Sequence, residues 1–339
     1  MKITTLGNIG LGFATALAMT VSAEAGEKVT FGTNWVAQAE HGGFYQAVVD
    51  GTYAACGLDV EIVPGGPNVN NRALLLAGKI DFLMDGNLLQ PFNAVKEDIP
   101  IVVLASMFQK EPQVMLSHPG EGLDTWESLK TADTMLIGNG GYQSFFRWMV
   151  SIGFQDEQRK PYTYSAAPFL ADKKSVQQGY VTSEPHVIEV EAGFTPNIFL
   201  LADYGFDTYS TLIDTMQATI DERPEAVKCF VEGSIIGWNN YMYGDNTAAN
   251  ALIQQHNPDL TDDAIAYAIS AMQKYGIVDS GDSETLGIGA MTDARIKSFY
   301  DKMVTAGVVD AGLDLSTVYT LDYINKGVGL DVKKALTGG

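Results

Sequence analysis

The segment Asn34-Trp35, followed by Glu40-His41-Gly42-Gly43-Phe44-Tyr45-Gln46-Ala47 and then by Gly57-Leu58-Asp59-Val60, is the most informative stretch of the chain. A β-branched run from Lys28 to Thr33 precedes it and predicts a strand, whereas residues 43–55 predict an amphipathic helix. The turn between them carries an indole, an imidazole and a pair of glycines. Such side chains at a strand-to-helix turn are suited to contact a flat, ring-shaped solute.

Strand-like and helical segments alternate along most of the chain. Strands are predicted at residues 29–32, 60–63, 82–84, 101–105, 114–117, 134–137, 162–164, near 181 and at 198–201. Helices are predicted between them at residues 43–55, 70–77, 88–95, 142–152 and 185–192. This order predicts an α/β fold with largely parallel sheets. Long helices at residues 224–241, 248–255, 261–275 and 293–306 then predict a helical C-terminal extension.

Two breaks in the alternation, at residues 109–112 and 204–209, predict two crossings between lobes. The first lobe is expected to comprise residues 26–110 and 208–339, and the second lobe residues 111–207. Ligands of α/β sheets bind at the carboxyl ends of the strands, so two facing lobes would place those ends along one cleft.

Polar and aromatic residues follow several of the predicted strands, where a core would need aliphatic ones. The candidate ligand-binding residues are Trp35, His41, Tyr45, Asp85, Asn87, Phe108, Gln109, Asn139, Gly140, Gly141, Tyr142, Tyr180 and Glu184. The turn at residues 138–142 opens a helix, so its free backbone N–H groups could bind an acceptor. Each residue alone also fits an ordinary packing or turn position, and only their convergence at one end of two sheets indicates a site.

The N-terminus has the pattern of an export signal. Met1 and Lys2 give a positive start, residues 6–19 are largely apolar, and small residues around Ala23 or Ala25 offer a cleavage site, which predicts a periplasmic protein. No later apolar run reaches the roughly 18 to 20 residues of a membrane helix. The net charge of -20 disfavours nucleic acid and anionic membrane surfaces as partners.

Cysteine and histidine spacing gives no sign of a metal or a redox centre. Cys56 and Cys229 could form a bridge or remain two separate small hydrophobic residues, because sequence separation reveals no geometry. No Cys-x-x-Cys or His-Glu-x-x-His occurs, nor a Gly-x-Ser-x-Gly or a phosphate loop with lysine. We therefore expect no metal and no cofactor.

The chain resembles the periplasmic solute-binding proteins of ABC importers over essentially its whole mature length. The resemblance is carried by Trp35, His41, Gly43, Ala47, Gly51, Tyr53 and the run 57–60, then by Leu76-Ala77-Gly78-Lys79-Ile80-Asp81-Phe82 and the Glu184-Pro185 turn. The group it is similar to contains thiamine-pyrimidine precursor binders and the eukaryotic pyrimidine synthase, with nitrate, sulfonate and riboflavin binders as broader relatives. The chain departs from the pyrimidine branch at Asn34-Trp35-Val36-Ala37, where that branch has Asp-Trp-x-Pro, and it lacks the cysteine-rich motif of the synthase.

The resemblance implies a type II two-lobed binding fold that closes around its solute and delivers it to a membrane permease driven by an ATPase. The expected receptor is a monomer without catalytic residues. A heteroaromatic solute such as a pyrimidine or another vitamin-like ring would suit the aromatic residues and carboxylates. The alternatives are a small anion such as a sulfonate or nitrate on the helix start at residues 138–142, and an enzyme that uses His41 with Glu184 or Asp85 as an acid–base pair.

Overall fold

The computed structural model describes residue 1, residues 26–67 and residues 69–338. The expected export signal and its cleavage site, at residues 2–25, lie outside the described residues. Within the described residues, ten strands form two sheets: β1 Glu27–Gly32, β2 Leu58–Val63, β3 Phe82–Asn87, β4 Ile101–Phe108, β5 Gln113–Ser117, β6 Thr134–Ile137, β7 Arg159–Pro161, β8 Ser175–Tyr180, β9 Asn197–Leu200 and β10 Ser210–Met216.

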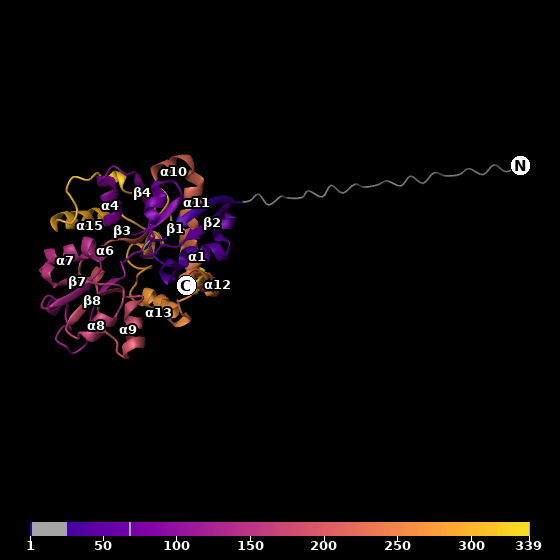
Figure 1. The fold of residues 1–339 in the computed structure, drawn as a ribbon. Helices are drawn as coiled ribbons and strands as arrows, with labels where there is room; N and C mark the ends of the chain where they lie inside the picture. Colours follow the sequence, from indigo (N-terminus) through magenta and orange to yellow (C-terminus); the bar gives the residue numbers. More distant parts are fainter. Residues whose placement is uncertain (2–25, 68, 339) are drawn as a thin grey trace.

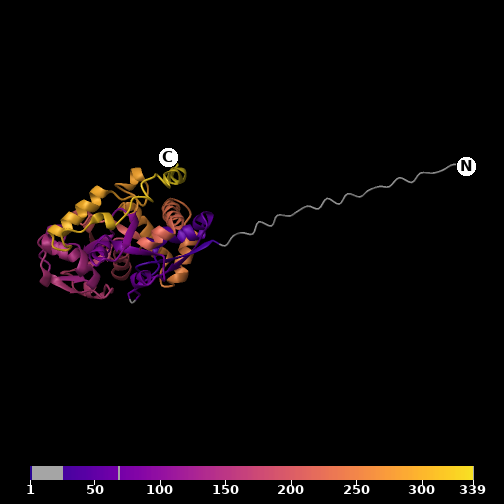
Figure 2. The same cartoon turned by 90° about the horizontal axis from the view of Figure 1, so that it is seen from above.

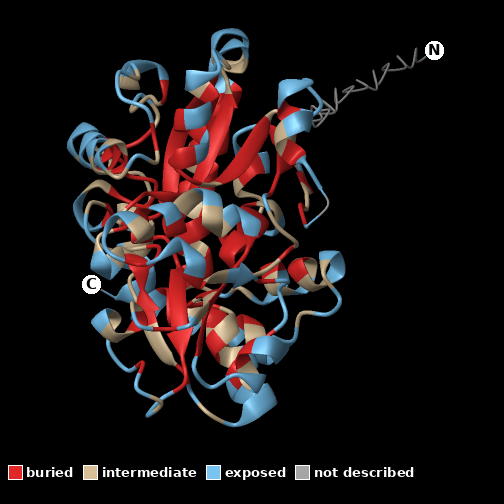
Figure 3. Cartoon of the chain, turned by 60° about the vertical axis from the view of Figure 1, so that its left-hand side comes forward, coloured by how far each residue is buried: buried red, intermediate tan, exposed pale blue. Residues whose placement is uncertain are grey.

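Helices surround both sheets and leave the strands at the centre of each lobe, as Figure 3 shows in red. Their bounds are α1 Gly42–Val49, α2 Thr52–Ala55, α3 Asn71–Leu76, α4 Leu89–Lys96, α5 Trp126–Leu129, α6 Asn139–Gly141, α7 Arg147–Ser151, α8 Ala167–Ala171, α9 Glu184–Ala192, α10 Gln217–Glu222, α11 Pro224–Tyr243, α12 Thr247–His256, α13 Asp262–Lys274, α14 Ser283–Leu286, α15 Asp293–Thr305 and α16 Leu330–Thr337. Short 3-10 segments lie at Ala39–His41, Asp156–Gln158, Leu201–Tyr204 and Leu315–Thr317. A π turn, Tyr142–Phe146, joins α6 to α7.

The first sheet has the strand order β2-β1-β3-β10-β4. Strands β1, β2 and β3 are parallel, as the alternation predicts. Strand β10 was not expected, and it runs antiparallel between β3 and β4. The sheet is therefore mixed, and the chain re-enters its centre only after the second lobe is complete.

The second sheet has the strand order β7-β6-β8-β5-β9 and is also mixed, because β5 is antiparallel to both of its neighbours. The strand expected at residues 162–164 lies earlier, at β7. Tyr164 has a φ of 61°, a left-handed conformation that a regular strand does not contain. The two sheets occupy two separate lobes, which Figure 1 shows above and below one another. The α/β two-lobed fold expected from the sequence is confirmed.

The glycine pair Gly42-Gly43 serves helix packing. A Cβ atom on Gly42 would lie 2.1 Å from the ring of Tyr241, and one on Gly43 would lie 2.1 Å from the indole of Trp238. Both rings belong to α11, so α1 can approach this long helix only because the two side chains are absent. We had interpreted the pair as part of a solute-holding turn, and the structure corrects that interpretation.

A disulfide joins Cys56, at the end of α2, to Cys229 in α11. Their Cα atoms are 6.0 Å apart although 173 residues separate them in sequence. The sequence left open whether these cysteines pair, and the structure shows that they do. The bridge ties the start of the helical extension to the first lobe.

The helical extension returns to the first lobe and also contacts the second. Ser106 of β4 forms an isolated bridge with Gly289, and Val103 forms one with Tyr319. On the other side, the hydroxyl of Tyr267 in α13 donates to the backbone oxygen of Val181, 3.2 Å away. Figure 2 shows the yellow C-terminal segments lying along one side of both lobes. Among the described residues, none of the helices combines the length and apolar character that a bilayer crossing requires.

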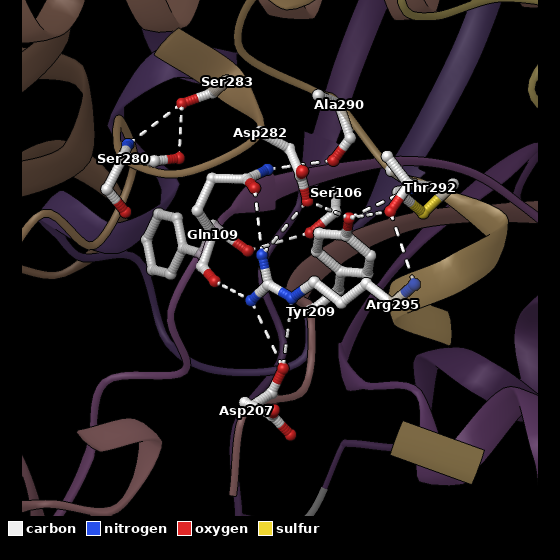
Figure 4. A network of polar contacts seen from close by, with 12 residues as sticks. Ser106, Gln109, Asp207, Tyr209, Ser280, Asp282, Ser283, Ala290, Thr292 and Arg295 are labelled. Carbon is white, nitrogen blue, oxygen red and sulfur yellow. Dashed lines mark hydrogen bonds and ion pairs between the residues drawn. The ribbon is translucent and has the colours of Figure 1, made fainter. Parts of the chain in front are cut away.

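Two chain segments connect the lobes, residues 109–112 and residues 201–209, and Arg295 of α15 holds them together (Figure 4). Its guanidinium donates to the backbone oxygens of Gln109 and Asp207, with the Nε–O distance to Asp207 being 3.3 Å. The same guanidinium lies 4.1 Å from the ring centre of Tyr209. A side chain of the C-terminal extension therefore links both halves of the hinge.

Candidate ligand-binding cleft

A cleft of about 530 Å³ lies between the two lobes. The first lobe supplies the ends of β1, β3 and β4, the start of β10 and the beginning of α4. The second lobe supplies the end of β8, the start of α9 and the helical turns after β6. These are the strand ends at which the sequence predicted a site, and the volume suits a small organic solute.

Eight of the thirteen candidate residues line this cleft. They are Trp35, His41, Asn87, Phe108, Gly140, Gly141, Tyr180 and Glu184. The five others do not reach it, and each has a different environment.

Tyr45 and Asp85 interact with residues outside the cleft lining. Tyr45 is buried within α1, where its hydroxyl lies 2.8 Å from Nδ1 of His256. Asp85 does not line the cleft, although its β3 neighbours Met84 and Gly86 do. It forms an ion pair with Arg72 of α3.

Gln109, Asn139 and Tyr142 contact other parts of the protein. The Nε2 of Gln109 donates to the backbone oxygen of Ala290 at 2.9 Å, within the hinge. Asn139 accepts a hydrogen bond from Arg159 at 2.7 Å, and the same guanidinium lies 4.5 Å from the ring centre of Tyr142. The helical turns after β6 thus present residues 140, 141, 143 and 144 to the cleft and residues 139 and 142 to Arg159.

Several cleft-lining residues were missing from the candidate set. The most important are Glu40, Glu111, Gln113, Tyr164 and Gln178. The polar side chain of Gln113, at the start of the largely apolar strand β5, was a usable signal. Tyr164 gave no signal, because its left-handed backbone conformation is not readable from the sequence.

Three carboxyl groups in the cleft are withdrawn from water. Burial raises the pKa of Glu40 to about 7 and that of Glu111 to about 8, and it also raises the pKa of Glu184. Tyr180 lies among them, since the charges of all three carboxyls act, after burial, to raise the pKa of its hydroxyl. The cleft therefore gathers three carboxyl groups around one tyrosine, and burial favours their protonated forms.

The hydrogen bonds of these carboxyls differ. Glu40 accepts from the hydroxyl of Thr182, so it joins the first lobe to the second. Glu184 accepts from the backbone N–H of Tyr180 at 2.7 Å. Glu111 accepts from Asn87 at 3.1 Å through Oε1, whereas its Oε2 has no partner among the described residues. A buried oxygen without a partner is costly and is available to a ligand.

His41 is a neutral group of the cleft wall. It is 1% exposed, and burial lowers the pKa of its imidazole to about 3. Neither ring nitrogen has a hydrogen-bond partner among the described residues. A neutral imidazole offers one donor and one acceptor, so His41 can position a solute without adding charge.

Aromatic rings from both lobes meet at the cleft. The ring centres of Trp35 and Tyr164 are 5.2 Å apart at an angle of 47°. Tyr164 is 56% exposed, so its ring is not held by the core of the second lobe. These two rings already contact each other, so together they form an aromatic wall of the cleft to which both lobes contribute.

The helix start after β6 contributes backbone groups to the same cleft. A Cβ atom on Gly140 would meet open space, whereas one on Gly141 would lie 2.6 Å from Oε1 of Gln178. That same oxygen accepts from the backbone N–H of Gly138 at 2.7 Å. Part of the donor capacity of this turn is therefore used within the protein.

Two lobes on mixed sheets, two crossings and a cleft at the strand ends define the periplasmic binding-protein fold. The chain belongs to the family described as NMT1/THI5 like, whose model matches residues 38–248.

The chain is similar to known proteins whose ligands differ from one another. The chain is 21% identical to the riboflavin-binding protein RibY of Chloroflexus aurantiacus over 311 residues, which cover 89% of this chain and 87% of that protein. The alkanesulfonate-binding protein SsuA of Xanthomonas axonopodis pv. citri has a TM-score of 0.61 at 11% identity, covering 86% of this chain and 98% of that one. The nitrate-binding protein NrtA of Synechocystis PCC 6803 has a TM-score of 0.59 at 13% identity, covering 91% and 89%.

Proposed function

We propose that this chain is the extracytoplasmic receptor of an ABC uptake system, which closes around a small heteroaromatic solute and delivers it to a membrane permease. The family and the fold support a receptor, and the expected export signal supports a periplasmic location. The observation that carries the proposal is the cleft between the lobes, because its walls combine aromatic rings and hydrogen-bonding groups from both lobes.

Closure follows from how the solute would be held. A ligand shifts the open and closed populations only by its difference in affinity for the two states. A solute that contacts Trp35 of the first lobe and Tyr180 of the second gains most of its contacts when the lobes meet. It therefore stabilises the closed form, which the permease would engage.

The heteroaromatic class is supported by the chemistry of the walls. Glu40, Glu111 and Glu184 accept hydrogen bonds when ionised, so they suit ring N–H and amino groups. Side-chain amides of the lining, such as those of Asn87 and Gln178, can supply both donors and acceptors to ring nitrogens and carbonyls.

A small anion is the second candidate. Two proteins of the same fold bind an alkanesulfonate and nitrate, and the turn at Gly140 and Gly141 opens onto the cleft. The described lining contains neither lysine nor arginine, and it contains three carboxyls, of which Glu40 and Glu111 are buried. An anion would have to approach these carboxyls without a counter-charge, so we favour the ring.

We propose binding without chemistry. The acid–base pair of His41 with Asp85 is separated, because Asp85 pairs with Arg72 and does not line the cleft. His41 also has no hydrogen-bond partner among the described residues that could orient it as a general base.

A thermal-shift screen of vitamins, their precursors, nucleobases, alkyl sulfonates and nitrate tests the proposal. A binder raises the melting temperature according to RT ln(1 + [L]/Kd), so a ring compound should produce a concentration-dependent rise. Each hit is then incubated with purified protein and analysed by mass spectrometry. A shift from an anion alone would favour the second candidate, and consumption of a bound compound would show an enzyme.

A further inference from the structure

The charges of the cleft are of one sign. Its described lining includes Glu40, Glu111 and Glu184 but no lysine or arginine. The single histidine of the lining, His41, stays neutral because burial lowers the pKa of its ring to about 3. No side chain of the described wall can therefore balance an ionised carboxyl.

Basic side chains on elements around the cleft are paired with other groups, as Arg295 is with Gln109. Arg72 pairs with Asp85, and Lys110 pairs with Asp203 at 2.9 Å on the hinge. Arg159 donates to Asn139 at 2.7 Å. A basic side chain could enter the cleft only by giving up such a contact.

Glu111 has an open oxygen within this cleft. It is 4% exposed, and Oε2 lacks a partner among the described residues while Oε1 accepts from Asn87 at 3.1 Å. A buried carboxyl is costly to ionise alone, whereas a cation in contact with it restores the lost solvation. The raised pKa values of Glu40 and Glu111 agree with carboxyls that are buried without a positively charged partner.

Aromatic rings lie in the same cleft as the carboxyls. Trp35, Tyr164 and Tyr180 line the same cleft as the three carboxyls. The faces of indole and phenol rings attract cations, and flat cations with delocalised charge gain stacking as well.

Resting on the proposed receptor function, we propose that the solute is an organic cation whose positive charge is spread over a flat, nitrogen-containing group, such as a pyridinium or an amidinium. Glu111 is its principal counter-ion, and Glu40 and Glu184 share the charge. Its flat face packs against the aromatic wall to which both lobes contribute.

Two sets of probes test the charge while the ring is kept constant. The first set is 1-methylnicotinamide, nicotinamide and nicotinate, and the second is benzamidine, benzamide and benzenesulfonate. In each set the members are a cation, a neutral molecule and an anion. Isothermal titration calorimetry at pH 8.5 on the full mature chain should show at least about 10-fold tighter binding of the cation than of its neutral counterpart, the ratio expected of one charged hydrogen bond.

A charge-removing variant tests the role of Glu111. Glu111→Gln keeps the size of the side chain and its acceptor for Asn87. It should weaken binding of the cations by about 10- to 100-fold and leave the neutral members within about twofold. Glu97→Gln is the matched control, because it removes the same charge from an exposed position outside the cleft lining. It should leave all affinities unchanged.

The outcomes separate this inference from the proposed function. If the cations bind no more tightly than the neutral or anionic members, the inference is overturned. A neutral ring found in the thermal-shift screen would then leave the receptor proposal in place. If Glu97→Gln weakens cation binding as much as Glu111→Gln, the effect comes from the net charge of -20 rather than from the cleft, and the inference also fails.

Discussion

Replacing Arg295 by alanine should loosen the hinge and lower the free energy of unfolding. Its guanidinium donates to the backbone oxygens of Gln109 and Asp207 and to Oε1 of Gln109 at 3.2 Å, and it lies 4.1 Å from the ring centre of Tyr209. Figure 4 shows these contacts meeting at one side chain. Asp282 is 3.4 Å away, so the charge is also paired.

The magnitude follows from the number and kind of these contacts. Hydrogen bonds to charged groups contribute about 1.5 to 3 kcal/mol each, and a cation over a ring about 0.5 to 1 kcal/mol at an exposed site. The side chain of Arg295 is 23% exposed, so water can replace some of its bonds after truncation. We therefore expect Arg295→Ala to lower the free energy of unfolding by about 3 kcal/mol.

Urea unfolding followed by circular dichroism measures this loss, and the midpoint should fall while the slope is unchanged. Lys297→Ala on the same helix is the control, because its ion pair with Asp301 lies on the surface and should contribute less than about 1 kcal/mol. Equal midpoints for Arg295→Ala and Lys297→Ala would refute the reasoning. A smaller slope of the unfolding free energy against urea concentration would show instead that the lobes no longer unfold together.

Three further outcomes are expected. Trp35→Ala should remove most solute affinity and keep the melting temperature within a few degrees, as shown by calorimetry and a thermal melt, because the indole lines the cleft; an unfolded variant would contradict this. Gly141→Val should abolish binding, because a Cβ there would come within 2.6 Å of a side-chain oxygen, and unchanged affinity in a folded variant would remove this turn from the site. Between pH 6.5 and 8 the melting temperature of the solute-free protein should fall, because the raised pKa values of Glu40 (about 7) and Glu111 (about 8) stabilise the fold only while these carboxyls keep their protons. The lowered pKa of His41 does not contribute to this fall, because its effect on stability is complete above pH 6.5. Glu111→Gln should therefore make the fall in melting temperature smaller. An unchanged fall would contradict the raised pKa of Glu111.

The sequence predicted the parts of the fold that depend on local pattern. Hydrophobic runs and helix starts placed most strands and the long helices, and the breaks at residues 109–112 and 204–209 coincide with the two connections. Strand β10 was not predicted because Asp214 and its polar neighbours are not typical of a central strand. Burial and the nearby charge of Asp85 raise the pKa of Asp214, and Arg72 offsets part of this effect. That compensation is tertiary, so no local pattern reveals it.

The candidate site was predicted by position rather than by side-chain direction. Trp35, Asn87 and Tyr180 follow strand ends and line the cleft, as expected from topology. Asp85 was assigned to the cleft because the predicted strand ended at Met84, but β3 continues to Asn87 and the carboxylate of Asp85 pairs with Arg72. The pairing of Cys56 with Cys229 required the distance between α2 and α11, which sequence separation does not contain.

The hinge and the cleft share one segment of chain. Phe108 and Glu111 line the cleft, and Gln109 between them is held by Arg295. A solute that contacts Glu111 therefore acts directly on the segment about which the lobes turn. Closure needs no long-range pathway under this arrangement, because ligand contact and hinge restraint lie within the same few residues. The break at residues 109–112, which predicted a crossing and one candidate residue, Gln109, therefore contributes Glu111 to the wall of the cleft instead.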